Sequence, residues 1–371
     1  MRIAIVTDAW LPQTNGVVTT LSRTAKALRE LGHDVRLFTP EPYRTIPCPS
    51  YPEIRLSLFA GRRLRASLID FAPDAIHIAT EGPLGLAARG YCKRHRLVFT
   101  TSYHTQFPAY VRKRFPIPER WTYRFVRWFH NAAHCTMVPT PAIVEDLREN
   151  GFHNPVLWGR GVDTDLFKPS DASRDSRASP IFLYVGRIAV EKNIDAFARM
   201  KLPGRKIVVG DGPDLPRLRK QFPDCIFTGY KFGRELVDII ASADVFVFPS
   251  RTDTFGLVML EAMACGVPVA AYPVPGPVDV VRHGITGWLS ESLDRAVQGA
   301  LTLDRADCRA HALRNGWARC SEQFANHLVA TTGPDTLSLA MPEIRNGANR
   351  GDNLPGSLRR GNCNEDRPTN R

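Results

Sequence analysis

The chain has 371 residues, a formal net charge of +12 at pH 7 and 43% hydrophobic residues, a composition typical of a globular protein. This length is sufficient for two domains. No apolar run approaches the roughly 18 residues that span a bilayer, and the strand-like run Met1–Val6 leads at once into polar residues, so we expect a cytoplasmic protein without a signal peptide. The eight cysteines are scattered without metal-ligand spacing, which predicts reduced thiols.

Strand-like and helix-like segments alternate through the first half of the chain. Apolar runs predict strands at 3–6, 34–39, 75–78, 97–101 and 135–139, and helical patterns lie between them at 17–31, 84–95 and 141–149. Such alternation predicts a doubly wound parallel sheet, which we assign to residues 1–167.

A second alternating set follows a polar, small-residue segment that we interpret as a linker, residues 168–180. Strands are predicted at 181–185, 206–209, 225–228, 245–248 and 268–271, with helices around 194–200, 215–221, 233–242 and 257–265. These elements predict another Rossmann-like domain, residues 181–307. Residues 333–371 contain no aromatics and are rich in Asn, Gly and Arg, so we expect a disordered tail.

Asp253 and Glu261 lie eight residues apart in a strand–loop–helix pattern. A helix N-terminus binds anions because its backbone N–H groups are free and its dipole is positive there. An acid on each side of such a site suits the hydroxyls of a nucleotide sugar. The alternative is a buried helix with two solvated acids. The N–H donors would come from Phe255, Gly256, Leu257 and Val258.

This segment resembles the carboxylate-x7-carboxylate motif of the retaining GT4 glycosyltransferases. The resemblance extends over roughly residues 1–330. Within the family, the chain is similar to bacterial GDP-mannose-dependent alpha-mannosyltransferases and glycolipid-forming glycosyltransferases. It implies the GT-B fold, in which two Rossmann-like doubly wound parallel-sheet domains face a central cleft, and a C-terminal helix, here 308–332, that crosses back to the first domain. It also implies that Asp253, which replaces the usual Glu, contacts the transferred sugar and that Glu261 binds the ribose.

Arg187 and Lys192 stand five residues apart in the loop after the first strand of the second half. Two cations on one loop can hold a diphosphate and offset the charge that develops on the leaving group. The pair resembles the Gly-Arg…Lys signature of the GT4 family. Solvated surface charge is the alternative.

Asn15 and Gly16 open the first helix, and Gly16 permits close backbone approach to a ligand. The pair resembles the GT4 glycine loop that faces the distal phosphate and the acceptor, although Asn15 replaces the first glycine. An ordinary turn is the alternative. No Gly-x-Gly-x-x-Gly follows the first strand, which disfavours a dehydrogenase.

His104 follows a predicted strand of the first domain. The resemblance places it beside the transferred sugar, which it would position, although a lone histidine is often structural. Gly210, Tyr230 and Lys231 follow two strands of the second half, where the family binds the nucleoside base.

Asp163 and Asp165 form an Asp-x-Asp sequence like the metal-binding motif of another glycosyltransferase fold. GT4 members commonly have a turn here, so we interpret Asp165 as a cap or hinge residue. We expect no essential metal and no cofactor besides the nucleotide-sugar donor as co-substrate, because Arg187 and Lys192 would take the role of the metal.

Residues 107–129 combine arginines with aromatic residues, and residues 112–127 contain six basic residues and one acid. This composition is typical of a helix on an anionic membrane surface, whereas the alternative is a helix that packs on the core. Nucleic acid is disfavoured because no recognition motif accompanies the charge. The predicted helix has two faces, one with Trp121, Phe125, Trp128 and Phe129 and the other with Arg120, Arg124 and Arg127.

The resemblance and these motifs predict a retaining glycosyltransferase. It would move a hexosyl group from GDP-mannose, a UDP-hexose or a UDP-uronate to a lipid hydroxyl such as that of diacylglycerol, or to a glycan, at the inner face of the cell membrane. The resemblance implies that the acceptor attacks from the face that the diphosphate leaves. The alternatives are a sugar-nucleotide epimerase of the same fold and a non-catalytic protein that binds membranes or nucleic acid.

Overall fold

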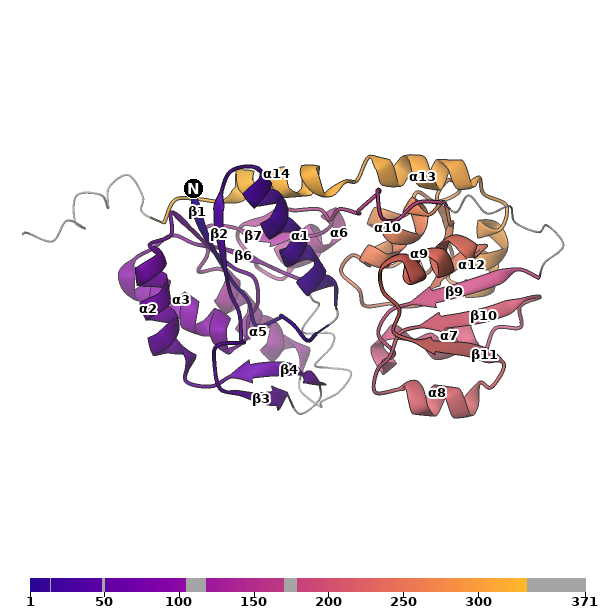
Figure 1. The fold of residues 1–371 in the computed structure, drawn as a ribbon, viewed down its shortest axis with the longest axis horizontal. Coiled ribbons are helices and arrows are strands. Elements are labelled where there is room, and N and C mark those ends of the chain that lie inside the picture. Colours follow the sequence, from indigo (N-terminus) through magenta and orange to yellow (C-terminus); the bar gives the residue numbers. More distant parts are fainter. Residues whose placement is uncertain (14, 49–50, 105–117, 170–178, 332–371) are drawn as a thin grey trace, which may run out of the picture. The chain divides into compact units, whose positions relative to one another are not determined.

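The computed structural model describes residues 1–13, 15–48, 51–104, 118–169 and 179–331. These residues build two six-stranded parallel sheets, each surrounded by helices (Figure 1). Strands such as β1 (Arg2–Val6) and β12 (Val245–Phe248) are buried along nearly their whole length because helices cover both faces of each sheet. The predicted class, two Rossmann-like doubly wound domains, is confirmed.

The first sheet has the strand order β2-β1-β5-β6-β7-β8, with parallel pairing throughout. Alternate residues of β1 enter the cores on opposite faces: Ala4 and Val6 face one, Ile3 and Ile5 the other. The remaining strands are β2 (Asp34–Phe38), β5 (Ala75–Ile78), β6 (Thr100–Ser102), β7 (Thr136–Val138) and β8 (Pro155–Leu157). Around them lie α1 (Gly16–Glu30), α2 (Ala60–Phe71), α3 (Pro83–His95), α5 (Glu119–His130), α6 (Pro141–Glu149) and an antiparallel hairpin of β3 (Thr45–Cys48) and β4 (Tyr51–Ser57).

The second sheet has the order β11-β10-β9-β12-β13-β14, again with parallel pairing throughout. Its strands are β9 (Ile181–Val185), β10 (Arg205–Val209), β11 (Cys225–Gly229), β12, β13 (Val269–Ala271) and β14 (Gly287–Leu289). The helical elements are η1 (Val190–Lys192), α7 (Ile194–Ala198), α8 (Leu215–Gln221), α9 (Gly233–Ser242), α10 (Leu257–Ala264), α11 (Pro277–Val280) and α12 (Leu293–Ala300). Strand order reverses between β9 and β12, so the loops that follow these two strands begin on either side of a crevice, the usual ligand position in such sheets.

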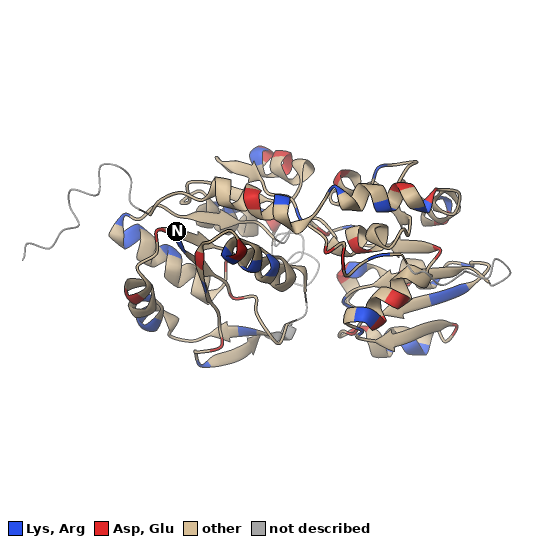
Figure 2. Ribbon diagram, turned by 45° about the horizontal axis from the view of Figure 1, so that its top comes forward, with Lys and Arg blue, Asp and Glu red and all other residues tan. Residues whose placement is uncertain are grey.

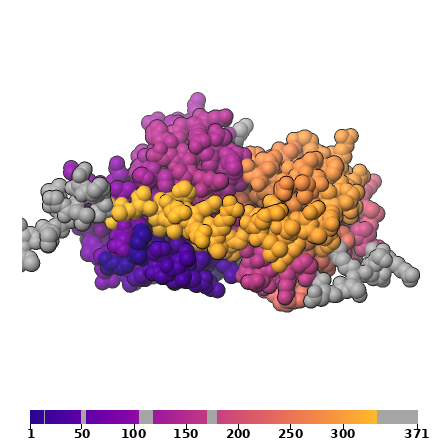
Figure 3. All heavy atoms as spheres, turned by 90° about the horizontal axis from the view of Figure 1, so that it is seen from above, coloured from indigo at the N-terminus to yellow at the C-terminus, as the bar shows by residue number. Residues whose placement is uncertain are grey.

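Two helices, rather than the single helix predicted over 308–332, complete the described chain. Helix α13 (Arg305–Leu313) packs on α10, and α14 (Trp317–His327) packs on α1. In the space-filling view the yellow C-terminal part of the described chain lies against the indigo N-terminal part (Figure 3). The break between them is held by a hydrogen bond from Val162 N to Asn315 O (2.9 Å). A Cβ at Gly161 would lie 2.6 Å from Trp317 Cα, so this crossing requires glycine.

Other differences from the sequence-based prediction are local. The strand expected at 97–101 begins at Thr100, and β3, β4, β8, β14, α2 and α12 were not predicted. Most of the expected linker and the expected disordered tail lie outside the described residues. The free thiols include those of Cys92, Cys135, Cys225, Cys265, Cys308 and Cys320, all of which are buried.

Candidate functional site

Lys192 and Asp253 form an ion pair beside the reversal between β9 and β12. Lys192 ends η1 in the loop region after β9, and Asp253 follows β12. Both side chains are largely buried, with 18% and 15% of their surfaces exposed. The second oxygen of Asp253, Oδ2, is buried without a hydrogen-bond partner among the described residues. The pairing joins two sequence-predicted residues that lie 61 positions apart.

Arg187 lies in the same loop, five residues before Lys192. The Tyr184 hydroxyl donates a hydrogen bond to Arg187 O (2.9 Å) and so holds the loop against the end of β9. Gly210 packs against this loop with φ of +135°, and a Cβ there would collide with the carbonyl of Gly186. The sequence-predicted Gly210 is therefore a residue that lets two loops approach closely.

The N-terminus of α10 follows the Asp253 loop. Gly256 has φ of +81°, and a Cβ there would lie 2.9 Å from the Phe248 ring. This left-handed residue turns the chain into the helix, whose first N–H groups have no partners within the helix. A Cβ added to Gly16 would lie 3.3 Å from Leu257 Cδ1, so the start of α1 meets the start of α10.

Asn15, which was predicted to line the donor site, caps α1 in the structure. Its Oδ1 accepts hydrogen bonds from Val17 N (3.0 Å) and Val18 N (3.1 Å). Two of the N–H groups at this helix start are thus satisfied by the protein itself. Gly16 remains the residue of this motif that faces the second domain.

Glu261 lies on α10, one turn beyond its start, and is partly buried. Burial raises the pKa of Glu261 to about 7, and the nearby charge of Arg23 opposes the rise. Arg23 on α1 pairs with Asp163 at 2.9 Å. The pKa of the carboxyl that was predicted to bind a ribose therefore lies near neutral pH.

His104 is held at three points. Its Nε2 lies 2.8 Å from Ser102 Oγ, its Nδ1 lies 3.2 Å from an Arg160 nitrogen, and its carbonyl accepts a hydrogen bond from Thr254 Oγ1 (2.7 Å). Thr254 follows Asp253, so this bond connects the first domain to the Asp253 loop. Burial, with Arg160 as the next contributor, holds the pKa of His104 well below its ordinary value of 6.5.

Tyr230 and Lys231 diverge in their surroundings. The Tyr230 ring is 44% exposed and stacks on Phe232, with 5.9 Å between centroids and 23° between planes. Lys231 instead pairs with Glu235, one turn along α9. The stacking of Phe232 on Tyr230 was not predicted, although an aromatic residue two positions after Tyr230 in the sequence could have indicated it.

Asp8, which the sequence analysis left without a role, occupies the N-terminus of α3. Its carboxylate accepts hydrogen bonds from Leu84 N (2.8 Å), Gly85 N (3.1 Å) and the Thr80 hydroxyl (2.9 Å). Burial raises the pKa of Asp8, although the bonds from Leu84 and Gly85 oppose this. Arg160 and Thr254 were also missed, because they contact His104 from 56 and 150 positions away in the chain. Ser102 was missed although it lies two positions before His104.

Asp163, rather than Asp165, makes the turn that was predicted around this pair. Its Oδ1 accepts a hydrogen bond from Leu166 N (3.0 Å), and Asp165 is exposed. Among the residues that the structure describes, no group of three His, Cys, Asp or Glu side chains has a metal-binding arrangement.

Helix α5 contains the described part of the basic aromatic segment, whereas residues 107–117 lie outside the described chain. Phe129 belongs to the core, while Trp121 and Trp128 are 63% and 52% exposed. Arg89 of α3 lies over the Trp128 ring at 3.6 Å. Both signs of charge occur on helices around both sheets (Figure 2). No helix in the described ranges has the length and apolar character needed to cross a bilayer.

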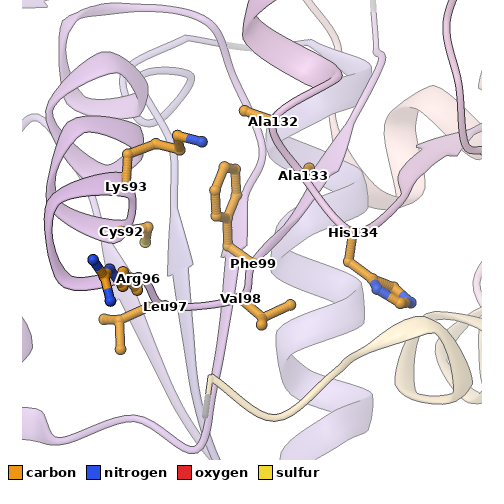
Figure 4. Close-up of a pocket in the computed structure, with 9 residues that line it drawn as sticks. All are labelled: Cys92, Lys93, Arg96, Leu97, Val98, Phe99, Ala132, Ala133 and His134. Atoms are coloured by element: carbon orange, nitrogen blue, oxygen red, sulfur yellow. The ribbon is translucent and has the colours of Figure 1, made fainter. Parts of the chain in front are cut away.

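A cavity of about 390 Å³ lies beside the C-terminal end of α3. In Figure 4, Lys93 extends from α3 beside the Phe99 ring, and His134 points away. It contains none of the sequence-predicted site residues. Its lining is formed by Cys92, Lys93, Arg96, Leu97, Val98, Phe99, Ala132, Ala133 and His134.

Comparison with solved structures identifies the fold. Sucrose-phosphate synthase from Thermosynechococcus elongatus superposes with a TM-score of 0.70 at 22% identity, over 88% of this chain and 97% of that chain. Anabaena HepE in complex with UDP and glucose gives 0.66 at 19% identity, over 88% and 98%. These are GT-B glycosyltransferase structures, so the predicted GT-B fold is confirmed.

Sequence comparison identifies the family. Residues 14–166 match the model for Glycosyltransferase Family 4, and residues 179–303 match that for Glycosyl transferases group 1. The GDP-mannose-dependent alpha-mannosyltransferase of Mycobacterium tuberculosis is 32% identical over 78% of this chain and 83% of that protein. Sulfoquinovosyl transferase SQD2 of Arabidopsis thaliana is 36% identical over 71% and 58%, and alpha-monoglucosyldiacylglycerol synthase of Acholeplasma laidlawii 28% over 72% and 79%. The chain therefore belongs to the GT4 family and is a glycosyltransferase that uses a nucleotide sugar.

Proposed function

We propose that this enzyme is a retaining hexosyltransferase that acts on a membrane lipid, with diacylglycerol as the first candidate acceptor. The observation that carries the proposal is the ion pair of Lys192 and Asp253 in front of α10. A cation and an acid in this position match the diphosphate and the sugar hydroxyls of the donor. The Arg187 loop and the start of α10 supply further groups that favour an anion.

Donor binding would break the ion pair of Lys192 and Asp253. The diphosphate would form ion pairs with Lys192 and Arg187, and the N–H groups at the start of α10 would donate hydrogen bonds to its oxygens. Asp253 would then turn to hydroxyls of the transferred sugar, for which it has an unpartnered oxygen. Glu261 would accept hydrogen bonds from the ribose, and the stacked pair of Tyr230 and Phe232 would lie near the base.

The transfer step would proceed on one face of the sugar. The acceptor oxygen forms a bond to C1 while the bond from C1 to the diphosphate oxygen breaks, and the acceptor proton passes to the departing diphosphate. Arg187 and Lys192 offset the charge on that leaving group, a task that needs no metal. The ring of His104 positions the sugar and does not take the proton, because both of its nitrogens are already engaged.

The choice of donor and acceptor rests on the relatives and on α5. The relatives include enzymes named for GDP-mannose and for glucosylation of a diacylglycerol. The exposed Trp121 and Trp128 on a helix with Arg120, Arg124 and Arg127 suit the surface of an anionic membrane. We therefore place the enzyme at the inner face of the cell membrane.

A donor and acceptor screen tests this function. The purified protein is incubated with diacylglycerol in anionic or neutral vesicles, with EDTA present, and receives GDP-mannose, UDP-glucose, UDP-galactose or UDP-glucuronate. We expect one donor to yield nucleoside diphosphate and a glycolipid of unchanged anomeric configuration, faster on anionic vesicles. Release of nucleoside diphosphate without glycolipid would contradict the lipid acceptor, an inverted anomer would contradict retention, and dependence on added metal would contradict the metal-free step.

A further inference from the structure

Arg160 is a buried cation without an acidic partner among the described residues. Only 7% of its surface is exposed. Its guanidinium donates hydrogen bonds to Trp158 O (2.6 Å) and Gly159 O (2.9 Å) and lies 4.2 Å from the centre of the Trp158 ring. The remaining contact is His104. Burial of a charge with neutral partners alone is costly, so stability alone does not account for an arginine here.

The contact with Arg160 determines which nitrogen of His104 carries the proton. Arginine donates and never accepts hydrogen bonds, so His104 Nδ1, 3.2 Å away, accepts with its lone pair. The proton of the neutral ring is therefore on Nε2, which donates to Ser102 Oγ at 2.8 Å. The Ser102 hydroxyl proton then points to Ala79 O (3.4 Å) or to His77 Nε2 (3.1 Å).

A protonated His104 does not fit this arrangement. It would direct an Nδ1–H group and a positive charge at the Arg160 guanidinium, which offers only N–H groups in return. The charged or titratable groups around the ring are Arg160 from the segment after β8, His77 of β5 and His130 of α5. Each of them disfavours a positive charge on His104. Ser102 supplies a single acceptor.

We propose that Arg160 is a positioning residue for glycosyl transfer, which fixes His104 as the neutral Nε2–H tautomer in one orientation between Ser102 and the guanidinium. The inference rests on the proposed function, in which His104 flanks the transferred sugar. That sugar becomes cation-like at C1 in the transition state, and a neutral ring adds no repulsion there. Thr254 bonds to the carbonyl of the same residue, so a displaced His104 would also disturb the Asp253 loop.

The first test reads the tautomer directly and needs no substrate. Protein labelled with ¹⁵N in histidine is examined by long-range ¹H–¹⁵N NMR from pH 8 to pH 5.5, with the His104 signals assigned by comparison with His104→Gln. We expect one neutral Nε2–H pattern over this range in the wild-type protein. An Nδ1–H pattern, or protonation of His104 above pH 6, would overturn the assignment of Arg160.

The second test reads catalysis in Arg160→Met and Arg160→Lys, with the exposed Arg148→Met as the matched control. At saturating donor we expect kcat of Arg160→Met to be about 10- to 100-fold lower and to fall more steeply with decreasing pH than that of the wild type, because one of the groups that lowers the pKa of His104 has been removed. Arg160→Lys should recover most of kcat at pH 8, and Arg148→Met should match the wild type. Equal kcat and equal pH profiles in Arg160→Met and wild type would refute the positioning role.

The two tests also separate this inference from the proposed function. An Nε2–H tautomer in a protein that turns over no donor would leave the assignment intact and refute the function. Turnover by an enzyme whose His104 carries the proton on Nδ1 would support the function and refute the assignment of Arg160. If Arg160→Met does not fold, the wild-type spectrum and the Arg160→Lys profile still decide the question.

Discussion

At the scale of single residues, the proposed site would make Asp253 and the donor diphosphate compete for Lys192. Lys192 is largely buried against Asp253, and that contact must be given up before a phosphate oxygen can replace the carboxylate. The ion pair compensates the charge of Lys192 within the protein, and we therefore expect it to weaken binding of the anion. Substitution of Asp253 should therefore strengthen binding of the diphosphate but reduce transfer of the sugar.

We expect Asp253→Asn to bind nucleoside diphosphate more tightly than the wild type while losing most of its transferase activity. Release of Lys192 from a partly buried pair of about 1 kcal/mol corresponds to about fivefold in Kd. Calorimetric titration with GDP and UDP measures the first effect, and donor turnover measures the second. Weaker nucleotide binding in Asp253→Asn would show that the two anions do not share Lys192.

Glu261 predicts a pH dependence of donor affinity. Because burial raises its pKa to about 7, the carboxylate that we propose as the acceptor of hydrogen bonds from the ribose is present above that pH and lost below it. The KM for the nucleotide sugar should fall about tenfold from pH 6 to pH 8, as the ionised fraction rises. In Glu261→Gln this change should vanish, and in Arg23→Met the midpoint should move to higher pH. A flat profile in the wild type would contradict the role of Glu261.

At the scale of elements, the start of α10 depends on one left-handed residue. Gly256 has φ of +81°, and a Cβ there meets the Phe248 ring, whereas Gly61 at the start of α2 has open space around it. Gly256→Ala should lower the free energy of unfolding by about 1–3 kcal/mol and weaken donor binding, because the N–H groups of α10 would shift. Gly61→Ala should be neutral or stabilising by up to about 1 kcal/mol. Urea unfolding and nucleotide titration compare the two, and equal effects would contradict this account of α10.

The same elements show what could be predicted from the sequence. The buried strands and the helices between them were predicted because continuous apolar runs alternate with 3.6-residue patterns, as in β12 and α9. The break between α13 and α14 was missed because its reason, the close approach of Gly161 to Trp317, joins residues far apart in the chain. The β3–β4 hairpin was missed because Pro47 and Pro52 interrupt its pattern.

The candidate site was predictable in its residue types and not in its pairings. The spacing of Arg187 and Lys192, and that of Asp253 and Glu261, was visible along the chain. The ion pair of Lys192 and Asp253 and the Arg160–His104 contact arise only when loops from different strands meet. The capping role of Asn15 follows from a general preference of helix starts, and that rule would have assigned it.

At the scale of the whole molecule, buried neutral histidines make the fold sensitive to acid. His77 is fully buried beside Trp158 and Phe324, and burial lowers its pKa to about 3 from an ordinary value of 6.5. The unfolded chain binds this proton below pH 6.5 and the folded chain does not, so the stability is complete above that pH and is lost progressively as the pH falls towards 3. His104 acts in the same direction.

We therefore expect the free energy of unfolding to decrease by about 2 kcal/mol between pH 7 and pH 5 through His77 alone. Denaturant unfolding at a series of pH values measures the slope. In His77→Gln, the slope of the free energy of unfolding against pH should be smaller by the equivalent of about one bound proton. A stability that stays constant from pH 7 to pH 5 would contradict the burial of a neutral His77.

We propose that the donor diphosphate binds beside the reversal between β9 and β12. The most direct test is the release of nucleoside diphosphate from the accepted nucleotide sugar by the wild type, by Lys192→Ala and by Lys220→Ala, whose lysine is exposed on α8. We expect kcat/KM to fall about 100-fold or more in Lys192→Ala, as for loss of a charge that stabilises the leaving group, and to be unchanged in Lys220→Ala. Equal turnover by Lys192→Ala and the wild type would show that the donor is bound elsewhere.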